Sequence, residues 1–360
     1  MTRTISTALL VLAAPLAAHA QDTLNFYNWS DYIAEDTIPN FESETGIDVN
    51  YDVFDSNEVV EARMLTGNTG YDLVVPSLEF MARQAQAGVF QEIDKERIGN
   101  YGNLDPEILR IVSGNDPDNT YGIPYMMYSV GPGYNVDMVT ERLPDADLDS
   151  WSLIFDPENA AALEDCGIAL LDSPSEIVGA ALNYLELDPN SEDTADLDRA
   201  MELLQGIRPH IRYFHSSQYI NDLANGDICL AVGYSGDILQ AKDRASEAGN
   251  GVDIRYVIPA EGGQLGFDMM VIPADAPNPD AAYAFIDYFL QPQVTAAISD
   301  AVYYANANRE ATPLVSDEVR EDPGIYPPEA TLQKMFSAVP KSARYDRSLT
   351  RAWTSLKTGR

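Results

Sequence analysis

Three apolar segments near the N-terminus decide the fold of this chain: Leu24-Asn25-Phe26-Tyr27-Asn28-Trp29, Ile47-Asp48-Val49-Asn50-Tyr51-Asp52-Val53 and Tyr71-Asp72-Leu73-Val74-Val75. In the second segment apolar and polar residues alternate strictly, which is typical of a β-strand. The third segment is apolar and partly β-branched, and Pro76-Ser77 ends it. We therefore predict three strands.

Helices are predicted in the two intervals between these strands. The first covers the mid-thirties to Thr45, and the second follows a cap at Asp55 or Ser56 and carries Val59 and Met64. Strands and helices that alternate at this spacing predict the α/β class, with a mainly parallel sheet flanked by helices.

The pattern restarts later in the chain. Gly167–Leu171 and Ile228–Val232 are predicted as buried strands, with a helix around Leu197–Ile207 between them. Asp253–Ile258 is predicted as a further strand, and Asn278 precedes a helix with apolar residues on one face.

A chain of 360 residues usually folds as two domains. We expect two α/β lobes with a ligand cleft between them and with chain crossings near Gly131-Pro132-Gly133 and Glu261-Gly262-Gly263. The expected division is residues 21–125 plus 249–305 for the first lobe and residues 126–248 plus 306–360 for the second.

Residues 1–20 are predicted to be a cleavable export signal. They contain Arg3, no acidic residue, an apolar run from about Ala8 to Ala18 and the small-residue end Ala18-His19-Ala20. Cleavage is predicted after Ala20, and the apolar run is too short to span a bilayer. We therefore expect an exported chain that does not insert into the membrane.

The chain is strongly acidic, with 57 acidic and 22 basic residues and a formal net charge of −35 at pH 7. Such a surface repels nucleic acids and anionic lipids and favours cationic partners. The acidic residues are scattered along the chain, so a general adaptation to stay soluble explains most of the excess of acidic over basic residues.

The only two cysteines, Cys166 and Cys229, each lie beside or within a predicted strand. They could form a disulfide or remain two buried thiols. Export favours the disulfide, which would link two parts of one domain.

Polar residues at strand ends are candidates for ligand contacts, because open α/β sheets bind ligands outside the carboxyl ends of their strands. Five groups there contain at least one carboxylate: Trp29-Ser30-Asp31-Tyr32, Pro76-Ser77-Leu78-Glu79, Asp172-Ser173-Pro174-Ser175-Glu176, Gly233-Tyr234-Ser235-Gly236-Asp237 and Gly266-Phe267-Asp268. For any one group, a helix cap is the simpler explanation. Aromatic rings cover carbon chains and attract cations, and carboxylates pair with ammonium groups. All five groups have a carboxylate and three also have an aromatic residue, and this recurrence favours a cation site.

In the same order, these groups resemble the ligand-binding segments of the periplasmic polyamine-binding proteins of ABC importers. The resemblance begins at Tyr27–Tyr32, includes Tyr121–Tyr125, Tyr303–Asn308 and Pro323–Pro328, and covers essentially the whole mature chain. It is closest to the putrescine-binding branch. It implies a two-lobed type II periplasmic binding protein, expected as a monomer, that closes on putrescine or spermidine and delivers it to an inner-membrane ABC permease. It implies no catalysis, no cofactor and no metal site.

The resemblance also implies roles for residues of the first two groups. Trp29 would contact the methylene chain of the ligand. Ser30, Asp31 and Tyr32 would surround one ammonium end, and Ser77 would lie beside them on the same rim.

Further roles follow for the later groups. Glu176 would hold an amine from the other lobe, and Asp237 would pair with an ammonium. Asp268 would be a central anion, and Tyr304 would line the cleft. The disulfide of the family fits the two cysteines.

Four positions differ from the family pattern, one of which is Met127 in place of a frequent tryptophan. Gly266 replaces an aromatic residue that normally stands beside the central aspartate, and Tyr234 replaces a larger tryptophan, so both changes are expected to open space. Glu79 stands where relatives have a small polar residue or a tyrosine, and it adds a carboxylate. A longer or more highly charged polyamine, such as spermidine, would use both the space and the added acid.

Two other functions stay open on the sequence alone. A polyamine-sensing receptor for a membrane signalling protein would carry the same ligand groups. An exported hydrolase built on a pair of carboxylates would need one acid of raised pKa and a water molecule.

Overall fold

The computed structural model describes residues 23–359, so the predicted export signal lies outside the described residues. These residues form one sheet of ten strands, in the order β2-β1-β3-β9-β4-β7-β5-β6, with β8 and β10 both paired to β4. The strands are β1 (Thr23–Trp29), β2 (Asp48–Phe54), β3 (Leu73–Val74), β4 (Gly122–Asn135), β5 (Ile168–Leu170), β6 (Ile211–Phe214), β7 (Leu230–Tyr234), β8 (Ile254–Tyr256), β9 (Gln264–Val271) and β10 (Ala305–Asn306).

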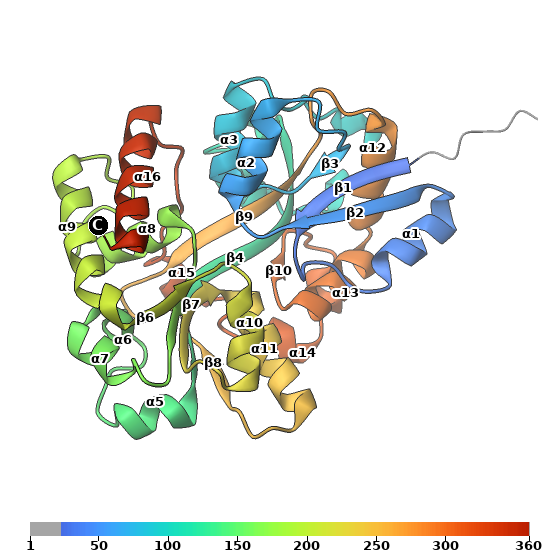
Figure 1. Ribbon diagram of the computed structural model, residues 1–360. Helices are drawn as coiled ribbons and strands as arrows, with labels where there is room; N and C mark the ends of the chain where they lie inside the picture. The colour runs from blue at the N-terminus through green and yellow to red at the C-terminus, as the bar shows by residue number, and fades with distance from the viewer. Residues whose placement is uncertain (1–22, 360) are drawn as a thin grey trace, which may run out of the picture.

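The sheet is parallel at both ends and antiparallel in the middle. β1 pairs in parallel with β2 and β3, and β5 pairs in parallel with β6 and β7. The pairs β3–β9, β9–β4 and β4–β7 are antiparallel. Figure 1 shows the long β4 and β9 running side by side between two groups of elements.

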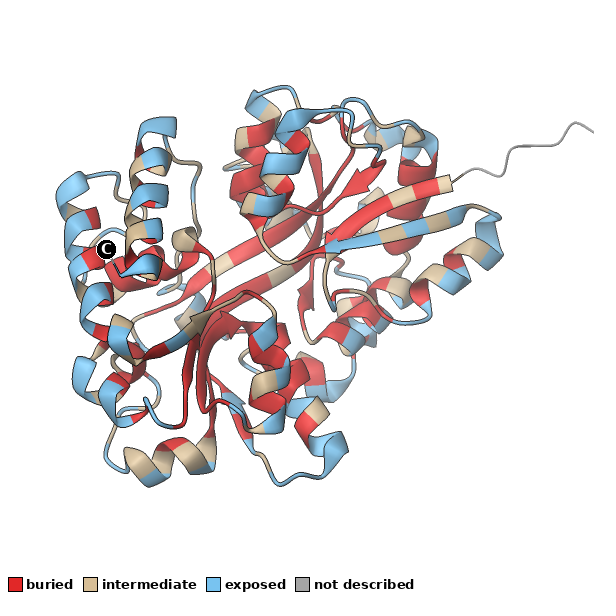
Figure 2. Ribbon diagram, viewed as in Figure 1, coloured by how far each residue is buried: buried red, intermediate tan, exposed pale blue. Residues whose placement is uncertain are grey.

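Helices flank both groups of strands, which confirms the predicted α/β class (Figure 1). They are α1 (Thr37–Thr45), α2 (Asn57–Thr66), α3 (Leu78–Gln86), α4 (Pro106–Val112), α5 (Val136–Arg142), α6 (Ser152–Phe155), α7 (Pro157–Ala162), α8 (Pro174–Tyr184), α9 (Thr194–Ile207), α10 (Gln218–Asn225), α11 (Ser235–Ala248), α12 (Pro279–Phe289), α13 (Pro292–Val302), α14 (Asp317–Arg320), α15 (Glu329–Leu332) and α16 (Ala343–Thr358). Figure 2 shows that the strands and the helix faces turned toward them hold most of the buried residues.

The N-terminal segments fold as their sequence pattern predicts. Ser56 is the N-cap of α2, and its hydroxyl accepts a hydrogen bond from the backbone N–H of Val59. β2 is the outermost strand, and its exposed polar residues explain the strict alternation in its sequence. The third strand, β3, covers only Leu73–Val74 and is shorter than predicted.

The middle of the sheet was not predicted from the sequence. β4 is buried along almost its whole length, so it shows no alternation of polar and apolar residues. Gly131-Pro132-Gly133, expected near a crossing, lies inside this strand. A Cβ atom on Gly131 would come within 2.2 Å of the Val257 carbonyl oxygen, and one on Gly133 within 2.4 Å of the Ile238 side chain. These glycines therefore let β8 and α11 pack directly on β4.

Cys166 and Cys229 form the disulfide that the sequence favours, with their Cα atoms 5.5 Å apart. The bond joins the residues just before β5 and β7, which are neighbours in the sheet.

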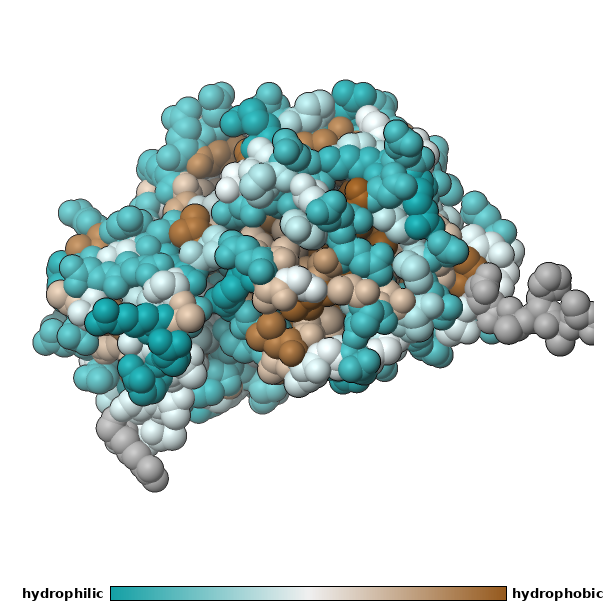
Figure 3. Space-filling model, turned by 90° about the horizontal axis from the view of Figure 1, so that it is seen from above, coloured by the Kyte–Doolittle hydropathy of each residue, from teal (hydrophilic) through white to brown (hydrophobic). Residues whose placement is uncertain are grey.

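The face seen from above is predominantly hydrophilic, and its apolar side chains gather only in small groups (Figure 3). Within residues 23–359, no helix combines the length and the apolar character needed to cross a membrane.

Candidate functional site

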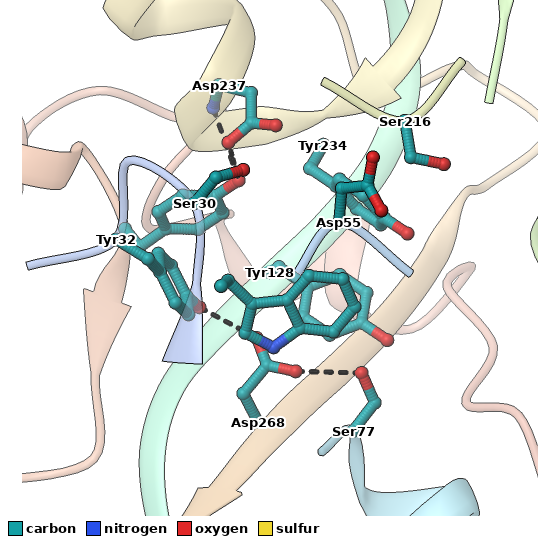
Figure 4. A pocket seen from close by; sticks show the side chains of 11 residues that line it. Ser30, Tyr32, Asp55, Ser77, Tyr128, Ser216, Tyr234, Asp237 and Asp268 are labelled. Atoms are coloured by element: carbon teal, nitrogen blue, oxygen red, sulfur yellow. Dashed lines mark hydrogen bonds between the residues drawn. The ribbon is translucent and has the colours of Figure 1, made fainter. Parts of the chain in front are cut away.

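A cavity of about 370 Å³, a volume that includes the solvent space at its mouth, lies where strands from both ends of the sheet meet β4 and β9. Figure 4 shows the lining side chains pointing toward one another from these different elements. The cavity is lined by Trp29, Ser30, Tyr32, Asp55, Ser77, Tyr128, Ser216, Tyr234, Asp237, Asp268 and Tyr304.

Strand ends bring several of the predicted groups to this cavity. Trp29 is the last residue of β1, Ser77 is the N-cap of α3 just after β3, and Tyr234 is the last residue of β7. The Gly266–Asp268 group is an exception, because it lies inside β9 and not at a strand end. β9 continues to Val271 because it pairs with β4 along most of its length, so a mid-strand side chain faces the cavity.

Asp268 is the most buried carboxylate of the cavity wall, with only 4 % of its surface exposed. Its Oδ1 accepts a hydrogen bond from the Ser77 hydroxyl at 2.7 Å, and its Oδ2 accepts one from the Tyr32 hydroxyl at 2.8 Å (Figure 4). Burial raises the pKa of Asp268 to about 7, although both hydroxyls lower it. None of the ion pairs formed within residues 23–359 includes Asp268.

Asp237, in the first turn of α11, is a second carboxylate of the same kind. It accepts hydrogen bonds from the Tyr219 hydroxyl at 2.7 Å and from the Tyr304 hydroxyl at 2.8 Å. Burial raises the pKa of Asp237 to about 6, and these two hydroxyls oppose the rise. The cavity therefore has two buried carboxylates, each fixed in place by two hydroxyl groups.

Aromatic rings form the wall around these carboxylates. Trp29 and Tyr234 meet edge to face with their ring centroids 6.1 Å apart, and Tyr234 meets Tyr128 in the same way at 5.4 Å. Tyr32 and Tyr304 meet edge to face at 4.9 Å. Ring faces of this kind attract cations and cover methylene groups.

The space expected at Gly266 is filled. Tyr128 stands opposite Gly266 on the neighbouring strand, and a Cβ atom on Gly266 would lie 2.1 Å from the Tyr128 ring. The expectation that this glycine opens room was therefore wrong, because an aromatic side chain from β4 occupies that place.

Four predicted site residues do not line this cavity: Gly266, which faces the Tyr128 ring, and Asp31, Glu79 and Glu176. Asp31 is exposed, has a positive φ of 54°, and its carboxylate pairs with the Arg244 guanidinium at 2.9 Å. Glu176 is fully buried nearby and accepts hydrogen bonds from the hydroxyls of Ser173 and Ser175. Glu79 is buried in the first turn of α3, and burial together with the charge of Glu176 raises its pKa to about 8.

Three lining residues were missed from the sequence. Asp55 directly follows β2, and Ser216 comes two residues after β6, so the strand-end rule applied to every strand would have found both. Tyr128 lies inside β4, where the sequence carries no signal for its direction.

The chemistry of the cavity suits an elongated organic cation. Its carboxylates lie among hydroxyls and rings, and its strand-end residues come from both ends of the sheet. Within residues 23–359, no three His, Cys, Asp or Glu side chains are grouped so as to hold a metal ion.

Comparison with known proteins agrees with this geometry. Residues 37–327 match the family model of the bacterial extracellular solute-binding proteins. The chain is 54 % identical to the putrescine-binding periplasmic protein PotF of Escherichia coli (strain K12), over 99 % of this chain and 97 % of that protein. It is 49 % identical to the putrescine-binding periplasmic protein SpuD of Pseudomonas aeruginosa (strain UCBPP-PA14), over 98 % and 97 %.

A solved structure shares the fold. The spermidine/putrescine ABC transporter substrate-binding protein PotD from Streptococcus pneumoniae (strain Canada MDR_19A) superimposes with a TM-score of 0.76 at 28 % identity, over 94 % of this chain and 99 % of that one. The resemblance found in the sequence is thereby confirmed. With a family match over most of its length and two relatives about half identical to it from end to end, this chain belongs to the bacterial extracellular solute-binding proteins.

Proposed function

We propose that this protein is a periplasmic binding protein that captures an aliphatic polyamine between its two lobes and delivers it to an inner-membrane ABC permease. The proposal includes export with cleavage after Ala20, action as a monomer and the absence of catalysis. The two putrescine-binding relatives support the ligand class and the location.

One observation carries the ligand assignment: Asp268 is a buried carboxylate without an ion-pair partner inside an aromatic cavity. A buried charge is costly unless it is paired, so in the unliganded protein Asp268 loses its proton only as the pH rises through about 7. An ammonium ion removes that cost by pairing with the carboxylate.

The two buried carboxylates of the cavity could each bind one ammonium group of a diamine. One ammonium group would pair with Asp268 and the other with Asp237, while the methylene groups lie against Trp29 and Tyr234. Hydroxyl donors already orient both carboxylates, so they need little rearrangement when the ligand arrives.

Ligand binding would favour closure, because the cavity residues come from both ends of the sheet. A ligand shifts such an equilibrium only by the difference in its affinity for the two states. The bound cation contacts Trp29 of β1 and Tyr234 of β7 together only when the two lobes are close, which is the condition for hinge closure.

Calorimetry with putrescine, cadaverine, spermidine, spermine and agmatine at fixed salt tests the proposal. Asp268→Asn is expected to abolish measurable putrescine binding and the rise in melting temperature that putrescine gives. Asp31→Asn is the matched control, because Asp31 is exposed and pairs with Arg244 outside the cavity, and it should keep putrescine affinity within about threefold. Absence of binding by every amine, or full binding by Asp268→Asn, would refute the assignment.

A further inference from the structure

Arg83 connects the two groups of elements that lie on either side of β4 and β9 in Figure 1. It lies on α3, which follows β3 and belongs to the group around β1, β2 and β3. Its partner Asp346 lies on α16, beside α8 and α9 in the group around β5, β6 and β7 (Figure 1). The Arg83 Nη1 and the Asp346 Oδ2 are 2.9 Å apart, although the two residues are 263 positions apart in the sequence.

The helix that carries Asp346 is attached to its own group. Near its end, the Lys357 ammonium pairs with the carboxylate of Asp172 at 2.7 Å, and Asp172 comes two residues after β5. The Trp353 indole N–H donates a hydrogen bond to the same carboxylate at 2.9 Å. The Arg208 guanidinium donates to the carbonyl oxygens of Leu356 and Lys357. Asp346 therefore moves with the group around β5.

The Arg83 guanidinium is held in place by residues of the first group. Its Nε and Nη2 donate to the two carboxylate oxygens of Glu61 on α2, each at 2.7 Å. The guanidinium also lies over the Phe80 ring, 4.6 Å from its centroid. A bidentate pair of this kind fixes the orientation of the guanidinium plane. The remaining nitrogen, Nη1, is thereby directed toward α16 before Asp346 arrives.

Among the residues that the structure describes, one other ion pair joins the same two groups. It links Asp31 to Arg244, whose side chains are 45 % and 34 % exposed. Arg83 and Asp346 are 28 % and 29 % exposed, so water screens their attraction less. Burial raises the pKa of Asp346, and the positive charge of Arg83 opposes this rise. The Arg83–Asp346 pair is therefore the stronger candidate for an energetic link between the groups.

A link of this kind acts on closure alone. If the two groups separate, Arg83 keeps Glu61 and loses Asp346, so the Arg83–Asp346 contact belongs to the closed state only. A contact made in one state shifts the equilibrium toward that state by its own free energy. Apparent ligand affinity then rises with the fraction of protein that is ready to close. Neither residue lines the ligand cavity, so this contribution needs no contact with the ligand.

We propose that Arg83 is a positioning residue that clasps Asp346 when the two groups of strands close, and that this clasp increases the affinity for the ligand and slows its release. Glu61 and Phe80 aim the guanidinium, and α16 carries the carboxylate that it reaches. This inference rests on the proposed function, because the clasp acts through closure on a bound ligand.

A double-mutant cycle measured by titration calorimetry with putrescine tests the clasp. Arg83→Gln and Asp346→Asn should each weaken putrescine binding about 3- to 10-fold, as expected for a half-buried, charge-assisted hydrogen bond. The double variant should bind within about twofold of the weaker single variant, because both changes remove the same contact.

The matched control is Arg142→Gln. Arg142 on α5 also forms a bidentate pair, with Asp165 at 2.8 and 2.9 Å, but both residues lie on the same side of the sheet, beside β5. This variant should keep putrescine affinity within about twofold, because its ion pair is the same in both states.

Two further measurements separate closure from folding. In stopped-flow experiments, Arg83→Gln should release putrescine faster by the same factor by which its affinity falls, with little change in the association rate. In small-angle X-ray scattering at saturating putrescine, it should reach the same radius of gyration as the wild-type protein. A variant damaged in its fold would not reach that radius.

Unchanged affinity in both single variants, or losses that multiply in the double variant, would overturn the clasp. If Arg83→Gln proves unstable, Asp346→Asn gives the same test and leaves the Arg83–Glu61 pair in place. Failure of the wild-type protein to bind putrescine, cadaverine, spermidine, spermine or agmatine would overturn the proposed function instead. The two failures are therefore distinguishable.

Discussion

Lowering the pH from 7.5 to 5.5 should weaken putrescine binding strongly, because the proton competes with the ligand for Asp268 and Asp237. Burial raises the pKa of Asp268 to about 7 and that of Asp237 to about 6, both above the ordinary value for aspartate. Amines of the lysine type titrate near pH 10, so putrescine keeps its two charges over this range. Only the ionised carboxylates pair with it, and affinity therefore falls as the pH falls.

The size of the effect follows from the fractions ionised. The Asp268 carboxylate is about three-quarters ionised at pH 7.5 and about 3 % ionised at pH 5.5, which weakens binding about 25-fold, or about 1.9 kcal/mol. Asp237 contributes a further factor of about 4 by the same reasoning, so the combined loss is about 100-fold. Putrescine should release about 0.3 protons per molecule bound at pH 7.5 and about 1.7 at pH 5.5.

Calorimetry at constant ionic strength, in two buffers of different ionisation enthalpy, measures both the affinity and the proton release. Glu202→Gln, an exposed change on α9, serves as control and should show the same pH dependence as the wild-type protein. An affinity that stays within threefold from pH 7.5 to 5.5, without proton release, would refute the idea that the ligand pairs with these buried acids.

Two further changes test the packing of the site and of the fold. Gly266→Ala should lower the free energy of unfolding by about 1–3 kcal/mol, and should weaken putrescine binding, because the new methyl group displaces the Tyr128 ring; chemical denaturation and calorimetry check this. Replacing Cys166 and Cys229 together by serine should lower the free energy of unfolding by about 4 kcal/mol, since the bond closes a loop with a sequence separation of 63, and should leave affinity at 25 °C unchanged.

Each of these changes has its own control. Gly102→Ala places a methyl group where no atom lies within 4 Å, so it should not lower stability as Gly266→Ala does. An equal loss at both positions would contradict the role given to Tyr128. For the cysteines, a double variant as stable as the wild-type protein under reducing and non-reducing conditions would contradict the role of the bond.

The outer parts of the fold could be predicted because their sequence patterns are local. The alternation in β2, the Ser56 cap and the helix after Asn278 each depend on neighbours within a few residues. β4 could not be predicted because it is buried along almost its whole length, contains Pro132, and pairs with strands from distant parts of the chain.

The site, like the fold, could be predicted where its residues follow a local pattern and could not where they depend on distant contacts. Trp29, Ser77 and Tyr234 were found because strand ends of an α/β sheet meet at one edge. The sequence could not show that Asp31 pairs with Arg244 outside the cavity, or that Tyr128 fills the space beside Gly266. Both contacts join residues more than 100 positions apart.

The paired β4 and β9 have a mechanical consequence for the proposed closure. A pair of hydrogen-bonded strands bends easily out of its own plane. It resists sliding of one strand along the other, because sliding breaks the hydrogen bonds between them. Their register shifts between Pro124 and Met127, next to Tyr128 in the cavity wall, and we expect the pair of strands to bend there, beside the proposed ligand site. In the proposed closure the two groups of strands would then approach each other by this bend, and the length of the ligand would set how far they move.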